Sequence, residues 1–319
     1  MTNALEDIVS TLDRIGKLEY DVREFINTGR HQVGLLKAKG KWNQICSSLD
    51  VLGDTVLSIR DYIWSPYPAS HGLKYIFTYG ILQSLFLQQD AVRHLSEAFD
   101  VPHASSDKLM KVREIRNSAI GHPTKQQIKK STNYNYISRI SLAKAGFTLM
   151  QSSEKSDVQF IDIDMMAIIG EQSADIETAL SLLSVKLKEA DRMHRQKFGE
   201  KLIADIFHAS TSYLFEKVSE GIHSPDGGNR SFGLSMLGSI EKMYVVFEGA
   251  LEERRELNDY TQYDLGEYKH AISVLKEYLL ENPKELSETD ARVYLFYLRE
   301  RHEHFVQIAN EVDDEYKKV

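Results

Sequence analysis

A helical stripe of apolar residues between residues 41 and 64 constrains the fold of this chain more than any other feature. Its apolar positions recur at alternating steps of four and three residues, which is the spacing of one face of an α-helix. They are Ile45, Leu49, Leu52, Val56, Ile59 and Ile63. Similar patterns predict helices over about 4–28, 71–99 and 107–121. Because short connections make helices antiparallel neighbours, the sequence predicts an N-terminal four-helix bundle.

The pattern changes after Pro123, where short segments alternate and are rich in β-branched and aromatic residues. This alternation predicts a small antiparallel sheet over 126–164. Helical spacing then returns up to the end of the chain. The expected helices span about 165–197, 200–221, 231–258, 263–281 and 289–316. We therefore predict a mainly α fold with a helical bundle over 1–125, a β element over 126–164 and an all-helical C-terminal domain over 165–319.

Composition excludes several classes of protein. The 319 residues are 42% hydrophobic and 27% charged, so the chain can bury a core. No uncharged apolar run is long enough to span a bilayer, and the acidic N-terminus lacks the apolar region of a secretion signal. A single cysteine, Cys46, cannot form an internal disulfide. These features predict a cytoplasmic protein without membrane contact.

The sequence also lacks the motifs that usually hold a cofactor or metal. It has no Walker phosphate loop and no dinucleotide-binding glycine motif after a predicted strand. His302 and His304 are two residues apart and so lack the i, i+4 spacing of a helical zinc site. We therefore predict no cofactor and no metal site.

Charge is distributed unevenly along the chain. The net charge is −8 overall, but between Lys108 and Lys144 nine basic residues accompany one acid, Glu114. This segment suggests a local surface that faces an anion such as RNA. We take Lys111, Arg113, Lys125, Lys129 and Lys130 as candidate RNA-binding residues. A solvated helix and hairpin would account for the same charge pattern.

The most informative motif joins Arg116 to His122 at the end of the fourth predicted helix. Arg116 falls on the edge of an apolar helical face, where an arginine usually pairs with a specific anion or packs its stem. Gly121 can end the helix in a left-handed conformation, and Pro123 disfavours a helical conformation at His122. Arginine can bind a phosphate and histidine can exchange a proton near neutral pH. Geometry alone leaves two interpretations open, a catalytic pair or a helix cap beside an ion pair.

The run from Arg116 through Asn117 to His122 fits the R-x(4–6)-H motif of HEPN domains (higher eukaryotes and prokaryotes nucleotide-binding). A polar residue directly after the arginine is usual in that family, and the motif lies at the last helix of a helical bundle, as it does here. The resemblance covers roughly residues 1–125. The sequence after residue 165 resembles no family that we can identify.

The resemblance implies a metal-independent endoribonuclease, often a toxin of a toxin–antitoxin system or an antiviral effector, that acts as a homodimer on RNA. His122 would serve in acid–base catalysis, Arg116 would hold the phosphate, and Asn117 would orient the phosphate or the histidine. The products would carry a 2′,3′-cyclic phosphate. Other family members are non-catalytic RNA- or protein-binding scaffolds, so this second role stays open. The C-terminal helices would bind a regulatory partner or extend the dimer.

Overall fold

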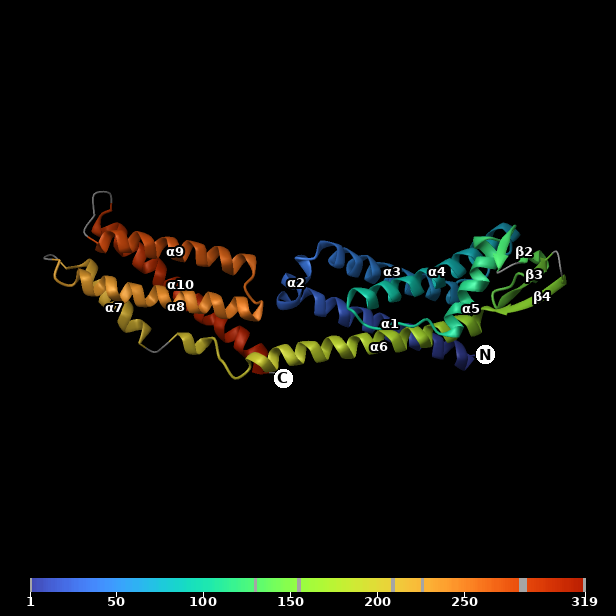
Figure 1. The fold of residues 1–319 in the computed structure, drawn as a ribbon, viewed down its shortest axis with the longest axis horizontal. Helices are drawn as coiled ribbons and strands as arrows, with labels where there is room; N and C mark the ends of the chain where they lie inside the picture. The colour runs from blue at the N-terminus through green and yellow to red at the C-terminus, as the bar shows by residue number, and fades with distance from the viewer. Residues whose placement is uncertain are drawn as a thin grey trace. The chain divides into compact units, whose positions relative to one another are not determined.

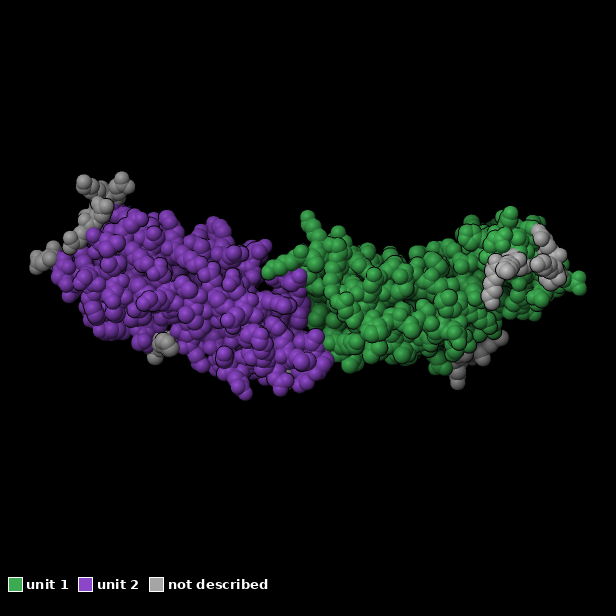
Figure 2. All heavy atoms as spheres, viewed as in Figure 1, with its two compact units in different colours: residues 1–27, 35–188 green, residues 28–34, 189–319 purple. Residues whose placement is uncertain are grey.

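The chain folds as a mainly α-helical protein with one small antiparallel sheet, as predicted (Figure 1). The computed structural model describes residues 2–128, 131–153, 156–207, 210–224, 227–280 and 286–317. These residues form two compact units (Figure 2). Unit 1 comprises residues 1–27 and 35–188, and unit 2 comprises residues 28–34 and 189–319. No described helix combines the length and the apolar character needed to cross a bilayer.

Long helices with one apolar face each build the core of unit 1. They are α1 (Thr2–Asn27), α3 (Lys39–Trp64), α4 (His71–Ala98), α5 (Asp107–Arg116) and α6 (Met165–Phe198), the last of which continues into unit 2. The stripe that begins at Ile45 and ends at Ile63 is buried along its whole length, which confirms its predicted role. The apolar faces of the neighbouring helices pack against it in one continuous cluster. Burial of these side chains is the main force that holds the bundle together.

A four-stranded antiparallel sheet is inserted between α5 and α6. Its strands are β1 (Gln126–Ile128), β2 (Ser131–Ile137), β3 (Gly146–Ser153) and β4 (Ser156–Asp164), paired in the order β1-β2-β3-β4. One face is buried against the bundle through Ile137, Leu149 and Ile163, whereas side chains on the alternate positions point away from it. The sheet therefore packs on the bundle as a half-covered layer.

The border between the compact units lies within α6, and not at residue 165 where the sequence pattern changes. The first part of α6 buries Ile169, Ile176 and Leu183 in the core of unit 1, so these residues fold with the bundle. The change from strand to helix at Met165 marks a change of secondary structure without a change of core. Apolar periodicity alone does not show which core a helix joins.

Unit 2 is all-helical and has a separate aromatic core. Its elements are the short helix η3 (Ala204–Ile206) and the helices α7 (Thr211–Ile222), α8 (Arg230–Arg254), α9 (Asp259–Leu279) and α10 (Glu288–Lys317). Tyr244, Tyr268 and Phe305 contact one another in its centre, with ring centroids 4.0 to 5.5 Å apart. Such contacts between rings stabilise a core beyond the area that they bury.

A short segment from the N-terminal third also belongs to unit 2. Arg30, in α2 (Gly29–Leu36), forms ion pairs with Asp191 at 2.8 Å, Glu256 at 3.2 Å and Glu315 at 3.0 Å. Burial opposes the charge of Arg30, but its hydrogen bonds to these carboxylates outweigh that penalty and raise its pKa. A buried ion pair with its hydrogen bonds complete is costly to break by removing one partner.

Two predictions about element bounds are wrong. Residues 29–36 form α2, whereas no helix is expected between those predicted over 4–28 and 41–64. Strand β1 lies within the β element predicted over 126–164, although the run Gln126–Ile128 itself shows no apolar alternation. The helix expected from residue 200 begins at Thr211, after the turn η3.

Gly146 gives a direct test of the sheet. A Cβ at this position would lie 1.9 Å from the carbonyl oxygen of Ile163 on the paired strand, so alanine cannot fit unless the backbone moves. We expect Gly146→Ala to lower the free energy of unfolding by about 2 kcal/mol or more. Gly80→Ala, in α4 with open space around the added methyl group, should raise it by about 0.5–1 kcal/mol.

Urea denaturation followed by tryptophan fluorescence measures this difference, because Trp42 and Trp64 both lie in unit 1. Equal midpoints for Gly146→Ala and the wild-type protein would contradict the close approach of the two strands.

Candidate functional site

The candidate site forms where α5 ends. Ser106 caps the start of α5, since its hydroxyl accepts a hydrogen bond from the Leu109 amide at 3.2 Å. At the other end, residues Asn117–Gly121 form a π-helical turn, closed by a 2.7 Å hydrogen bond from the His122 amide to the Asn117 carbonyl. Turns with this wider i→i+5 bonding are rare and are often found at functional sites. His122 then leaves the helix with φ −138° and ψ 52°, outside the helical region that a following proline disfavours.

Gly121 is needed here for a different reason from the one that the sequence suggested. The left-handed conformation predicted for it is wrong, because Gly121 does not have a positive φ angle. A Cβ at Gly121 would lie 2.9 Å from Nη1 of Arg116 and 3.3 Å from Oδ1 of Asn117. The Arg116 guanidinium therefore lies against the backbone of the residue that precedes His122.

Neutral groups hold the Arg116 guanidinium in place. Nε and Nη2 donate to Oε1 of Gln83 on α4 at 3.2 and 2.9 Å, and Nη1 donates to Oδ1 of Asn117 at 3.0 Å. The guanidinium carbon also lies 4.5 Å from the centre of the Phe86 ring, a distance that gives a cation–π contact. Among the described residues, no carboxylate forms an ion pair with Arg116. Its positive charge is fixed in position but not neutralised.

Asn117 links the two candidate catalytic residues. Its side chain accepts a hydrogen bond from Arg116, and its carbonyl accepts one from the backbone of His122. Arg116 and Asn117 are half-buried, whereas His122 is exposed. No side chain in the described part of the chain hydrogen-bonds to the His122 imidazole. The ring is therefore open to a ligand or a proton.

Arg113 differs from Arg116 although both contact the same ring. Its guanidinium carbon also lies 4.5 Å from the centre of Phe86, but it forms an ion pair with Asp90 and donates to Oε1 of Gln89 at 2.9 Å. The acid neutralises its charge locally. Its predicted contact with RNA stays a prediction. In the structure, its hydrogen bond and ion pair connect α5 to α4.

Lys111 and Lys125 lie close to the motif in the sequence. Both are exposed, and none of the described acids pairs with either of them. Lys129 and Lys130 lie outside the described residues. The structure thus brings together Arg116, Asn117 and the backbone of His122, and leaves Lys111 and Lys125 as surface charge.

A buried chain of glutamine side chains supports this end of the bundle. Gln172 on α6 donates to Oε1 of Gln88 and to the Leu85 carbonyl, both at 2.9 Å, and accepts from Gln89 at 2.7 Å. Gln88 and Gln172 are 0% exposed. Polar groups at this depth need partners, and these side chains supply most of them to each other, although Nε2 of Gln88 has no partner among the described residues. Gln89 then continues the chain to Arg113.

Gln83 and Phe86 are the site residues that sequence reasoning missed. Both lie on α4, more than 25 positions before Arg116, so no local spacing relates them to the motif. Their helical spacing of three residues places them on one face of α4. This spacing identifies Gln83 and Phe86 as site residues only once it is known that Arg116 lies against this face of α4.

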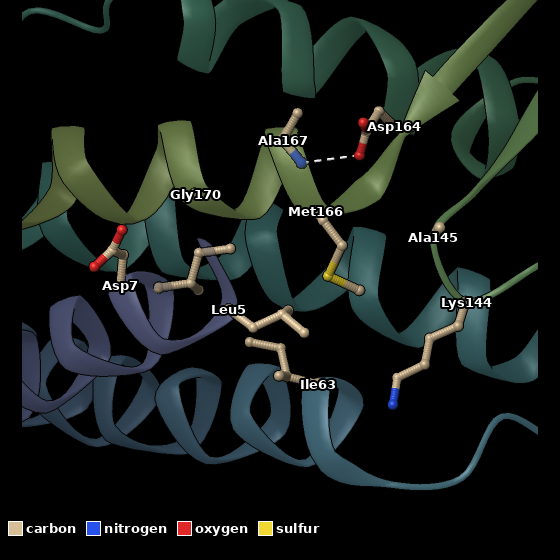
Figure 3. Close-up of a pocket in the computed structure, with 10 residues that line it drawn as sticks. Leu5, Asp7, Ile63, Lys144, Ala145, Asp164, Met166, Ala167 and Gly170 are labelled. Atoms are coloured by element: carbon tan, nitrogen blue, oxygen red, sulfur yellow. Dashed lines mark hydrogen bonds between the residues drawn. The ribbon is translucent and has the colours of Figure 1, made fainter. Parts of the chain in front are cut away.

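Unit 1 also contains an apolar cavity of about 670 Å³ away from the motif. Figure 3 shows Leu5, Ile63 and Met166 inside it, with Lys144 and Asp164 toward its edges. The Lys144 ammonium donates to the Ser65 carbonyl at 2.8 Å, and Asp164 accepts from the Ala167 amide at 3.0 Å. The lining includes no residue of the Arg116–His122 motif, so the cavity is a separate feature.

Comparison with known proteins adds no relative. No protein-family model, no curated protein and no solved structure matches the chain. The described residues contain no group of three or more His, Cys, Asp or Glu that could hold a metal ion. Any functional conclusion therefore depends on the motif and its geometry.

Replacement of Gln172 tests the glutamine chain. Gln172→Leu would leave Oε1 of Gln88 without a partner among the described residues and would remove one of the two acceptors of the Gln89 amide. We expect it to lower the free energy of unfolding of unit 1 by about 1–3 kcal/mol. Gln159→Leu on strand β4 is a matched control, because the Gln159 side chain is exposed and makes no hydrogen bond with side chains of the described residues. Its effect should stay within about 0.5 kcal/mol.

Urea denaturation with tryptophan fluorescence distinguishes the two variants. Similar losses for both, or no loss for Gln172→Leu, would show that the glutamine chain does not stabilise the bundle.

Proposed function

We propose that this chain is a metal-independent endoribonuclease of the HEPN type, with Arg116, Asn117 and His122 as its catalytic residues. The observation that carries the proposal is the Arg116 guanidinium, which neutral partners fix beside the residue before His122. A cation held without a counter-ion is suited to an anionic ligand, and a phosphodiester matches the planar donor geometry of arginine.

Arg116 has donors left for such a ligand. A guanidinium carries five N–H groups, and three of them point to Gln83 and Asn117. The other two can reach a phosphate oxygen while the side chain stays in place. Preorganised donors of this kind stabilise the charge that develops on phosphorus oxygens in a transition state.

The chemistry is an internal transfer within RNA. In the proposed step the ribose 2′-oxygen forms a bond to the neighbouring phosphorus, and the bond from phosphorus to the 5′-oxygen breaks. One product ends in a 2′,3′-cyclic phosphate and the other begins with a 5′-hydroxyl. The 2′-hydroxyl loses a proton and the leaving 5′-oxygen gains one, and the exposed His122 imidazole serves one of these transfers.

In the proposed homodimer, two copies of the motif would together supply the two proton transfers. A second His122 in the same cleft would provide the proton transfer that the first does not. A role in defence or in a toxin–antitoxin pair belongs to the same proposal, and it depends on the family resemblance alone.

A second candidate function is an interaction module, which the surface of unit 2 favours. A groove of about 790 Å³ between α9 and α10 is lined by Tyr263, Tyr294 and Tyr297. Nearby, Val293 and Phe296 on α10 are 62% and 64% exposed. Clustered exposed apolar side chains are typical of surfaces that bind protein, so unit 2 could hold a regulatory partner. This role is compatible with an active unit 1.

Single substitutions test the catalytic proposal. Arg116→Ala and His122→Ala should each reduce the rate of RNA cleavage in EDTA by roughly 10²- to 10⁴-fold, because one removes the phosphate contact and the other the proton transfer. Arg116→Lys should recover only part of the loss, since a lysine keeps the charge without the planar pair of donors. Gel analysis of a labelled RNA gives the rates.

Matched controls come from unit 2. His223 is an exposed histidine at the end of α7, as His122 is after α5, and Arg192 is a half-exposed arginine. His223→Ala and Arg192→Ala should cleave at the wild-type rate. An inactive wild-type protein, or equal rates for the motif variants and these controls, would refute the catalytic proposal.

A further inference from the structure

The outer face of the sheet carries a row of large apolar side chains. The pairing places Tyr136 on β2 opposite Met150 on β3, and Met150 opposite Phe160 on β4. Tyr134 lies two residues before Tyr136 and so points to the same face. Phe160 is 66% exposed, Tyr136 46% and Tyr134 37%. Three aromatic rings therefore share one solvent-exposed surface, which we name the aromatic face.

The side chains of the aromatic face are not part of the hydrophobic core of unit 1. The opposite face of the same strands is the one that is buried against the bundle, through Ile137, Leu149 and Ile163. A single exposed aromatic residue is normal on a protein surface, but a contiguous set usually marks a binding surface. The row ends where Thr148 hydrogen-bonds to Asp162 at 2.7 Å.

Strand β2, which carries two rings of the aromatic face, is joined to residues of and just after the Arg116–His122 motif. The amide of Asn135, which lies between the two tyrosines, donates to the Pro123 carbonyl at 2.7 Å. The Asn135 side chain donates to Oε1 of Gln126 at 2.9 Å, and Ser118 in the π-helical turn donates to the same oxygen at 3.0 Å. Pro123 follows His122 directly in the sequence.

Charge and ring chemistry identify the kind of ligand. The sequence between Lys108 and Lys144 carries eight more positive than negative charges and includes the motif and β2, whereas β4 at the other edge of the sheet carries Asp157, Asp162 and Asp164. An anionic chain that also offers flat π-surfaces complements a basic segment with exposed rings. Single-stranded RNA has both properties, whereas the bases of a duplex are stacked on each other and cannot reach the rings.

We infer that Tyr134, Tyr136, Met150 and Phe160 form a stacking platform for unpaired bases of single-stranded RNA next to the Arg116–His122 motif. This inference rests on the proposed ribonuclease function for its choice of RNA as the ligand. It adds the side chains that would bind the unpaired bases, and it places them on the sheet inserted between α5 and α6.

Fluorescence anisotropy of the full chain tests the platform. The probe is a fluorescein-labelled 2′-O-methyl RNA of about 12 unpaired nucleotides, a length within the usual range for such surfaces. It lacks the 2′-hydroxyl and so cannot be cleaved by the proposed reaction. We expect Tyr136→Ala and Phe160→Ala each to raise Kd by roughly 5- to 150-fold, the range measured for the loss of one stacked base. The same probe annealed to its complement should bind more weakly than the single strand.

Ring-preserving and ring-removing variants separate stacking from general apolar contact. Tyr136→Phe and Phe160→Tyr should bind within about twofold of the wild type, whereas Phe160→Leu should behave as Phe160→Ala, because leucine keeps apolar area without a π-face. Ile140→Ala is the matched control, since Ile140 is 94% exposed and lies outside the strands. Unchanged Kd values for both alanine variants would overturn the inference. Wild-type affinity of Phe160→Leu would also overturn it, because apolar area without a π-face would then be sufficient for binding.

The outcome is independent of catalysis. Ring-dependent binding by a protein that does not cleave RNA would support the platform and refute the proposed function. Cleavage of ordinary single-stranded RNA with unchanged Kd and KM in the alanine variants would support the proposed function and refute the platform. The variants change exposed side chains, and far-ultraviolet circular dichroism checks that they fold.

Discussion

The Arg116 guanidinium is held beside the end of α5 by groups that carry no negative charge, and the functional account depends on this contact. An arginine that pairs with a carboxylate has little attraction left for a phosphate, as Arg113 illustrates beside Asp90. Arg116 contacts an amide of α4, an amide of its own turn and the face of Phe86. These partners fix its direction without neutralising it. Electrostatic preorganisation of this kind costs little at the moment of reaction.

The fold holds that guanidinium through two features of the backbone. The π-helical turn brings the Asn117 carbonyl to the His122 amide. Both Arg116 and His122 therefore donate hydrogen bonds to Asn117. Gly121 leaves the space that the guanidinium fills. Behind them, the glutamine chain from Gln88 through Gln172 connects α4 and α6. A π-turn is costly to keep, and its presence at this position agrees with a site whose geometry is selected for function.

Sequence periodicity predicted the long helices well, because each buries one apolar face and the steps of three and four residues record that face. The stripe from Ile45 to Ile63 is the best example. The same reasoning could not place the border between the units, since α6 keeps one periodicity while it passes from one core to the next. It also could not identify β1 as a strand of its own, because polar glutamines there pair through the backbone and through side-chain hydrogen bonds to β2 without an apolar pattern. The position of Arg116 at the helix end was predictable, but its partners Gln83 and Phe86 were not, because tertiary packing brings them there.

The chemical nature of the cleaved ends tests the central claim most directly. Wild-type protein is incubated with single-stranded RNA in EDTA, and the fragments are identified by mass spectrometry. If Arg116 holds the phosphate while the neighbouring 2′-oxygen attacks it, the fragments will carry 2′,3′-cyclic phosphate and 5′-hydroxyl ends, and 2′-O-methyl RNA will stay intact. Fragments with 3′-hydroxyl and 5′-phosphate ends, or cleavage of the 2′-O-methyl RNA, would contradict the account.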